Sequence, residues 1–230
     1  MKLIKINETT RRIGRYTADF IDNFREGPLT VNLGVGTPTM AAEYIRKEEV
    51  YLHSENGLLG LGPLAPEGEQ DPDLVNAAME PATALPGASY TDLCTSFAMI
   101  RGGHIDVVVL GAFEVGEDGD IANWTRPGKT AGVGGAMDLA CCAGTLVVAM
   151  TQTSKGRFKL VRQCSLPITA FRAVDYVITE RGILHRTETG WVLEAMAEDT
   201  TAEQIRSEME FDFTLSPEVK ILPVEAEEAV

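Results

Sequence analysis

The 230-residue chain has few cysteines and histidines, and their spacing matches no disulfide or metal-binding framework. None of the four cysteines belongs to a Cys-x-x-Cys pair, and they are typical of small buried residues in a reducing compartment. None of the histidines has a second ligand at metal-binding spacing. We therefore expect no metal. The residues concerned are Cys94, Cys141, Cys142, Cys164, His53, His104 and His185.

Positive charge is also scarce. Lys and Arg number 20 against 34 Asp and Glu, giving a formal net charge of −14. With no basic stripe to neutralise phosphates, a nucleic-acid-binding role is not expected. The one basic cluster, residues 154–164 (SKGRFKLVRQC), is expected to be a solvated face. No apolar run reaches the roughly 18 residues of a membrane span, and the N-terminus lacks the apolar core of a signal peptide. A cytoplasmic location without membrane contact is expected.

The chain does have strand-like and helix-like segments in alternation. This pattern predicts a three-layer α/β domain whose central, mostly parallel sheet is flanked by helices. One domain is expected over residues 1–217, followed by an acidic tail over 218–230. The apolar run from 57 to 62 is a poor helix and a poor strand, because glycine occupies positions 57, 60 and 62. Strands are predicted at 29–33, 49–53, 105–111, 145–151 and 173–179, a hairpin at 183–197, and helices at 9–24, 91–103, 134–144 and 201–209.

Two glycine-rich junctions follow predicted strands. In VNLGVGTPT (31–39), backbone N–H groups at the start of a helix suit an anion, although a tight strand–helix turn explains the pattern equally well. In TRPGKTAGVGGAMDL (125–139), Lys129 precedes most of the glycines and the Gly-Lys-Ser/Thr ending is absent, so nucleotide hydrolysis is rejected. A backbone cradle for an oxyanion and close helix–sheet packing both fit this second segment.

A single acid, Glu55, lies in HSENGLLGLGP (53–63), directly after a predicted strand. In open α/β sheets, ligands bind at the carboxyl ends of the strands. For an arbitrary acid at such a place, a hydrogen-bonded turn is the commoner role. A nucleophile or general base is the sharper alternative.

Six blocks in order resemble a known family. They are VNLGVGTPT, SENGLLGLGP, SFAMIRGGHIDVVVLGAFEV, GDIANWTRPGK, GVGGAMDL and CSLPIT. Together they are similar to the B-type subunit of the family I CoA-transferases of the 3-oxoacid type, over Thr9 to Ser216. The resemblance implies a CoA-transferase or sugar-phosphate-isomerase-like fold.

The resemblance implies that Glu55 is the nucleophile. It would attack an acyl-CoA thioester, form an acyl–glutamyl anhydride and then an enzyme–CoA thioester, and pass CoA to a short-chain, 3-oxo type of acid. No cofactor is implied, because coenzyme A thioesters are substrates. The A-type subunit of the family is the implied partner, in an α2β2 or larger oligomer. Asn32 is the implied side-chain donor to the oxyanion, and the other implied oxyanion- or CoA-binding residues are Gly34, Gly36, Asn56, Gly57, Gly134, Gly135 and Ala136.

Two positions depart from the family pattern. His53 stands where relatives commonly have Gln, and Met79 stands where a Lys is expected. Loss of a cation near the site alters contacts with CoA or with an acyl carboxylate, and so bears on substrate choice. Two alternatives to transfer remain: an acyl-CoA hydrolase that uses the same glutamate, and a non-catalytic module that binds CoA or a sugar phosphate.

Overall fold

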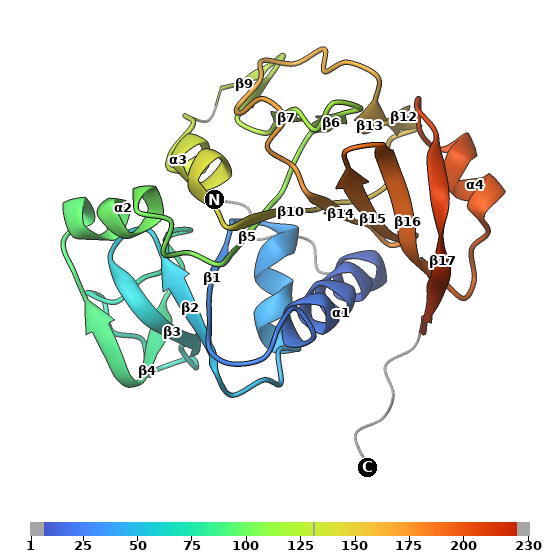
Figure 1. The fold of residues 1–230 in the computed structure, drawn as a ribbon. Helices are drawn as coiled ribbons and strands as arrows, with labels where there is room; N and C mark the ends of the chain where they lie inside the picture. The colour runs from blue at the N-terminus through green and yellow to red at the C-terminus, as the bar shows by residue number, and fades with distance from the viewer. Residues whose placement is uncertain (1–6, 131, 225–230) are drawn as a thin grey trace.

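The computed structural model describes residues 7–130 and 132–224, and one ten-stranded sheet runs through it (Figure 1). The strand order is β17-β16-β15-β14-β10-β5-β1-β2-β3-β4. These strands are β1 (Leu29–Leu33), β2 (Val50–Ser54), β3 (Leu58–Leu64), β4 (Ala82–Tyr90), β5 (Val107–Leu110), β10 (Thr145–Ala149), β14 (Tyr176–Ile178), β15 (Gly182–Thr187), β16 (Gly190–Ala197) and β17 (Phe213–Leu222).

The centre of the sheet is parallel and most of its flanking pairs are antiparallel. Strands β2, β1, β5, β10 and β14 run parallel, whereas β3 and β4 on one side and β15 and β16 on the other are antiparallel additions. The last strand, β17, is parallel to β16. The predicted α/β class with a mostly parallel sheet and the predicted hairpin at 183–197 are confirmed.

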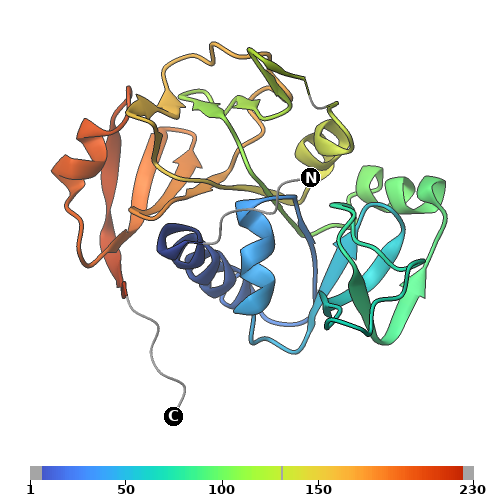
Figure 2. The same ribbon diagram turned by 180° about the vertical axis from the view of Figure 1, so that it is seen from behind.

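Helices lie on both faces of the sheet (Figures 1 and 2). They are α1 (Glu8–Asp22), the 3-10 helix η1 (Thr37–Glu43), α2 (Leu93–Arg101), α3 (Ala136–Cys142) and α4 (Ala202–Ser207). Small sheets add β6 (Glu114–Gly116), β7 (Ile121–Ala122) and β13 (Leu160–Val161), the pair β8 (Thr125–Arg126) and β9 (Lys129–Thr130), and the pair β11 (Thr153–Ser154) and β12 (Arg157–Phe158).

Strand β5 separates two hydrophobic cores. Val107 and Val109 belong to the cluster that includes α1, while Val108 and Leu110 belong to the cluster that includes α3. All four side chains are buried, as the continuous β-branched run predicts for a strand covered on both faces.

Three expectations are corrected. The glycine-punctuated run after Glu55 is a strand, β3, because antiparallel pairing with β2 and β4 and register shifts around Leu61 accommodate the glycines. The domain boundary at 217 falls inside β17, whose residues 220–222 pair with β16, so the tail does not begin at 218. Residues 225–230 of that tail lie outside the described residues. Cys94 and Cys141 are exposed rather than buried.

Candidate active site

Glu55 lies at the carboxyl end of β2, in the tight turn that joins β2 to β3. The Gly57 N–H donates to the Ser54 carbonyl at 2.9 Å, and Gly57 has a φ of 120°. A Cβ at Gly57 would lie 2.2 Å from the Thr91 carbonyl oxygen, so only glycine fits. The sequence-based placement of Glu55 at a strand end is therefore right, and its turn is held rigidly.

Asn32 approaches the Glu55 carboxylate from the neighbouring strand β1. Its Nδ2 lies 3.2 Å from Glu55 Oε2, as well as 3.1 Å from the His53 carbonyl and 3.2 Å from His53 Nδ1. The Asn32 side chain is fully buried, because β1 and β2 pair in parallel with Asn32 opposite His53. The structure thus brings together the two residues that the sequence nominated for chemistry.

His53 connects this amide to the backbone of Glu55. Burial lowers the pKa of His53 to about 4, so its imidazole is neutral near pH 7. Since Nδ1 accepts from Asn32, the proton lies on Nε2, which donates to Ser96 Oγ at 3.0 Å. The Ser96 hydroxyl then donates to the Glu55 carbonyl at 2.9 Å. Asn32 contacts the carboxylate and Ser96 the backbone, so this chain of bonds holds Glu55 at two points.

The second glycine-rich loop also reaches Glu55. A Cβ at Gly135 would lie 3.5 Å from Glu55 Cγ and 3.1 Å from the Phe97 ring. Gly135 is buried, and the preceding Gly134 has a φ of 56°. The loop therefore passes within contact distance of the Glu55 side chain, and a side chain at position 135 would press on the Phe97 ring.

The remaining predicted site residues make hydrogen bonds within the fold. The N–H groups of Gly34 and Ala136 already donate to Val109 and Val133, so neither is free for an anion in this conformation. The Asn56 amide donates to the Val75 carbonyl at 2.8 Å and fastens the turn. Gly36 caps η1, with its carbonyl accepting from Thr39.

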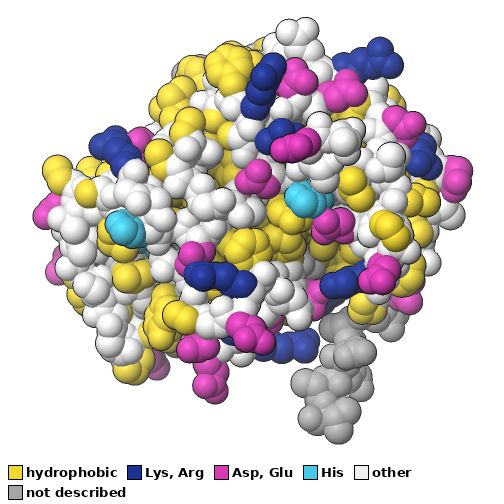
Figure 3. Space-filling model, in the orientation of Figure 1, with side chains coloured by type: hydrophobic (Ala, Val, Ile, Leu, Met, Phe, Trp, Pro, Cys, Tyr) yellow, Lys and Arg dark blue, Asp and Glu magenta, His cyan; other side chains and the backbone are white. Residues whose placement is uncertain are grey.

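The described residues contain no group of three or more His, Cys, Asp or Glu side chains placed to hold a metal. No helix within them is long and apolar enough to cross a membrane. On the face in Figure 3, Lys and Arg side chains lie among Asp and Glu side chains rather than in one continuous basic patch. The surface thus agrees with the charge balance of the sequence.

The chain resembles known proteins over most of its length. The family model described as coenzyme A transferase matches residues 18–208. A Bacillus subtilis protein, named as the probable B-type subunit of succinyl-CoA:3-ketoacid coenzyme A transferase, is 44% identical over 202 residues, covering 86% of this chain and 93% of that protein. The B-type subunit of the Pseudomonas putida 3-oxoadipate CoA-transferase is 44% identical over 193 residues, covering 83% and 88%.

Some relatives are longer. The mouse mitochondrial succinyl-CoA:3-ketoacid coenzyme A transferase 2B is 40% identical over 216 residues, covering 92% of this chain but 41% of that protein. Among solved structures, an acyl-CoA transferase of Escherichia coli O157:H7 in a thioester complex with CoA superposes with a TM-score of 0.71 at 21% identity, covering 97% and 44%. Glutaconate coenzyme A-transferase from Acidaminococcus fermentans gives a TM-score of 0.66 at 14% identity, covering 98% and 92%. These two structures share the fold.

Proposed function

Because this chain belongs to the coenzyme A transferase family, we propose that it is the B-type subunit of a CoA-transferase whose nucleophile is Glu55. The observation that carries the proposal is the Asn32 amide 3.2 Å from the Glu55 carboxylate, at the carboxyl edge of the parallel sheet. A glutamate in an ordinary turn does not need a buried amide donor supplied by another strand.

The reaction proceeds by exchange at two carbonyl carbons. The Glu55 carboxylate attacks the acyl-CoA thioester, the C–S bond breaks, and CoA leaves as a thiolate, giving an acyl–glutamyl anhydride. The thiolate then attacks the glutamyl carbonyl and releases the donor acid, leaving a glutamyl-CoA thioester. An acceptor carboxylate runs the same steps in reverse, so no net redox change occurs and the thioester bond energy is retained.

Each tetrahedral intermediate carries an oxyanion that needs a fixed donor. We assign this role to the Asn32 amide, which lies 3.2 Å from the Glu55 carboxylate, and one such donor is worth about 3 kcal/mol. The anhydride must also be kept from water. Buried Gly135 lies beside both the Glu55 side chain and the Phe97 ring, so these groups limit the access of water there.

The names of the relatives suggest the substrates and the partner. They are called 3-ketoacid or 3-oxoadipate CoA-transferases, two of them are named as the B-type subunit, and the mouse protein is more than twice as long as the matched region. We infer a short-chain, 3-oxo type of acid as substrate, and an A-type subunit as partner in an α2β2 or larger assembly.

The proposal is tested with the chain co-expressed with its A-type subunit. Incubation with acyl-CoA is expected to give a hydroxylamine-sensitive adduct on Glu55 of the wild-type chain. Glu55→Ala should remove the adduct and lower transfer by at least about a thousandfold. Glu67→Ala, an exposed acid beyond β3, should leave both unchanged.

Normal transfer by a folded Glu55→Ala protein would rule out the proposed nucleophile. The same assay separates transfer from hydrolysis. A transferase releases little free CoA with or without an acceptor acid and converts an added acceptor into its acyl-CoA, whereas a hydrolase releases free CoA continuously without any acceptor.

A further inference from the structure

Gln152 holds a hydrogen-bond donor that the fold leaves unused. The side chain is fully buried just beyond the carboxyl end of β10. Its Oε1 accepts from the Thr179 hydroxyl at 3.0 Å, and that hydroxyl also accepts from the Arg181 backbone N–H at 3.1 Å. Gln152 Nε2 is buried without an acceptor among the described residues. Such a group costs about 1–3 kcal/mol, so it calls for an explanation.

Lys159 is a second unused donor in the same region. Most of the segment 154–164 is exposed, as expected of a solvated face, but the Lys159 side chain is partly buried, and burial lowers its pKa to about 8. Glu180 raises that pKa and Arg126 lowers it, so both lie within electrostatic range. The Glu180 carboxylate accepts a hydrogen bond from the backbone N–H of Gln152 at 3.0 Å. Within residues 7–130 and 132–224, the Lys159 ammonium makes no hydrogen bond or ion pair.

Arg126 and Trp124 add two more donors. Trp124 Nε1 is buried and has no acceptor in the described part of the chain. The Arg126 guanidinium lies 5.0 Å over the ring of Phe113, which follows β5, and pairs with no described carboxylate. Two of these four groups are cations, and all four are N–H donors without a hydrogen-bond acceptor among the described residues.

The position of these donors relative to Glu55 decides what they bind. Gln152 follows β10, which is three strands from β2 in the sheet, and neighbouring strands are about 4.8 Å apart. The carboxyl end of β10, which precedes Gln152, therefore lies roughly 14 Å across the sheet from the end of β2 at Glu55. The chain runs from Arg126 through β9 to Gly135 beside Glu55, so the two places are connected (Figure 1). The pantetheine arm of CoA spans such a distance, whereas a four- to six-carbon acid does not.

We propose that Lys159, Arg126 and the Gln152 amide bind a phosphate group of CoA while its sulfur is at Glu55. The inference rests on the proposed transfer reaction at Glu55 and adds a binding site to it. A phosphate supplies acceptors to all three side chains, and charge-assisted bonds are the strong class. The competing source of the same oxyanion chemistry is the far carboxylate of a dicarboxylic acid.

The test compares thioester donors with and without phosphates, using the complex with its A-type subunit. Lys159→Met and Arg126→Ala should each raise the KM for acyl-CoA by about tenfold or more, with kcat within about twofold. With the acyl-pantetheine thioester, which has no phosphate, both variants should match the wild type. Arg157→Met removes one charge from an exposed position two residues from Lys159 and should have no effect on either KM.

Each other outcome contradicts the proposal. Unchanged KM values for acyl-CoA in both variants would show that the donors bind no phosphate. If the KM for a dicarboxylic acid rises in the variants, and rises equally when acyl-pantetheine is the donor, the site binds the carboxylate of the acid instead. Exposed Arg126 provides a variant expected to fold even if Lys159→Met does not. Adduct formation on Glu55 by acyl-pantetheine, measured in the same samples, shows separately whether the transfer chemistry itself holds.

Discussion

His53 is held neutral between Asn32 and Ser96, and this should make stability depend on pH. Its pKa falls from 6.5 in the unfolded chain to about 4 in the folded one because of burial. Between these values the unfolded state binds a proton that the folded state does not, so stability falls as pH decreases. We expect the His53 contribution to cost about 2 kcal/mol between about pH 7.5 and about pH 5.

The control is His53→Gln, which keeps a polar side chain that does not titrate. Urea unfolding of both proteins at the two pH values isolates the histidine, because the carboxylates titrate alike in each. The free energy of unfolding of the wild type should fall by about 2 kcal/mol more than that of the variant. Equal decreases would contradict a depressed pKa at His53.

The sequence could nominate Glu55 and Asn32 because each has a local signal. Each lies in a glycine-containing block that resembles a family motif, and Glu55 follows a predicted strand. Ser96 was missed, although it contacts both His53 and Glu55. It lies in α2, 41 positions beyond Glu55, and nothing in the spacing around it distinguishes a site serine from a core serine. Contacts of that kind depend on how helices pack on the sheet.

At the scale of elements, the buried parallel strands were predictable and the added edge strands were less so. Strand β5 is identifiable from four consecutive apolar residues that are covered on both faces. By contrast, β17 contains Pro217 and exposes much of its length, so its sequence suggests a tail. Its pairing with β16 is set by tertiary contacts, which local propensity does not report.

Leu222 provides a test of β17 as a structural strand. It is 6% exposed and packs in the core cluster that includes α1, and its carbonyl accepts from the Glu198 N–H. We expect Leu222→Ala to lower the free energy of unfolding by about 2–5 kcal/mol. Lys220→Ala on the same strand is exposed and should stay within about 0.5 kcal/mol of the wild type. Chemical denaturation measures both, and a Leu222→Ala protein as stable as Lys220→Ala would support a tail.

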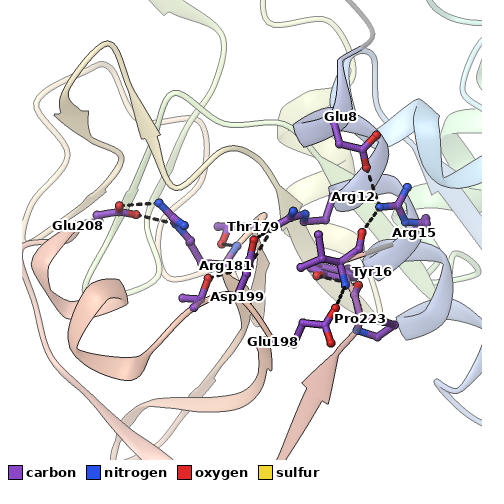
Figure 4. Close-up of polar contacts among 12 residues, drawn as sticks. Glu8, Arg12, Arg15, Tyr16, Thr179, Arg181, Glu198, Asp199, Glu208 and Pro223 are labelled. Carbon is purple, nitrogen blue, oxygen red and sulfur yellow. Dashed lines mark hydrogen bonds and ion pairs between the residues drawn. The ribbon is translucent and has the colours of Figure 1, made fainter. Parts of the chain in front are cut away.

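For the molecule as a whole, helix α1 is joined to the end of the described chain (Figure 4). Arg12 pairs with Asp199 at 2.9 Å, and Arg15 donates to the Val224 carbonyl at 2.6 Å. The Tyr16 hydroxyl donates to the Pro223 carbonyl at 3.1 Å. These contacts link segments about 200 positions apart, and no sequence periodicity predicts them. They hold α1 on the sheet face opposite α3, where Ile13 of α1, Val50 of β2 and Leu222 of β17 belong to one core cluster.

Tyr16 makes this junction sensitive to alkali. The side chain is 3% exposed, and burial raises its pKa from 10 to about 12, with the nearby acids Asp199 and Glu198 adding to the shift. Above pH 10 the unfolded chain loses the phenolic proton while the folded chain keeps it, so stability falls with rising pH.

At about pH 8, Tyr16→Phe should be less stable than the wild type by about 1 kcal/mol, through loss of the hydrogen bond to the Pro223 carbonyl. By about pH 11 that difference should shrink by about 1.4 kcal/mol and so vanish or reverse. Urea unfolding of both proteins at the two pH values checks this, and a constant difference would mean that Tyr16 ionises as easily in the folded protein as in the unfolded chain.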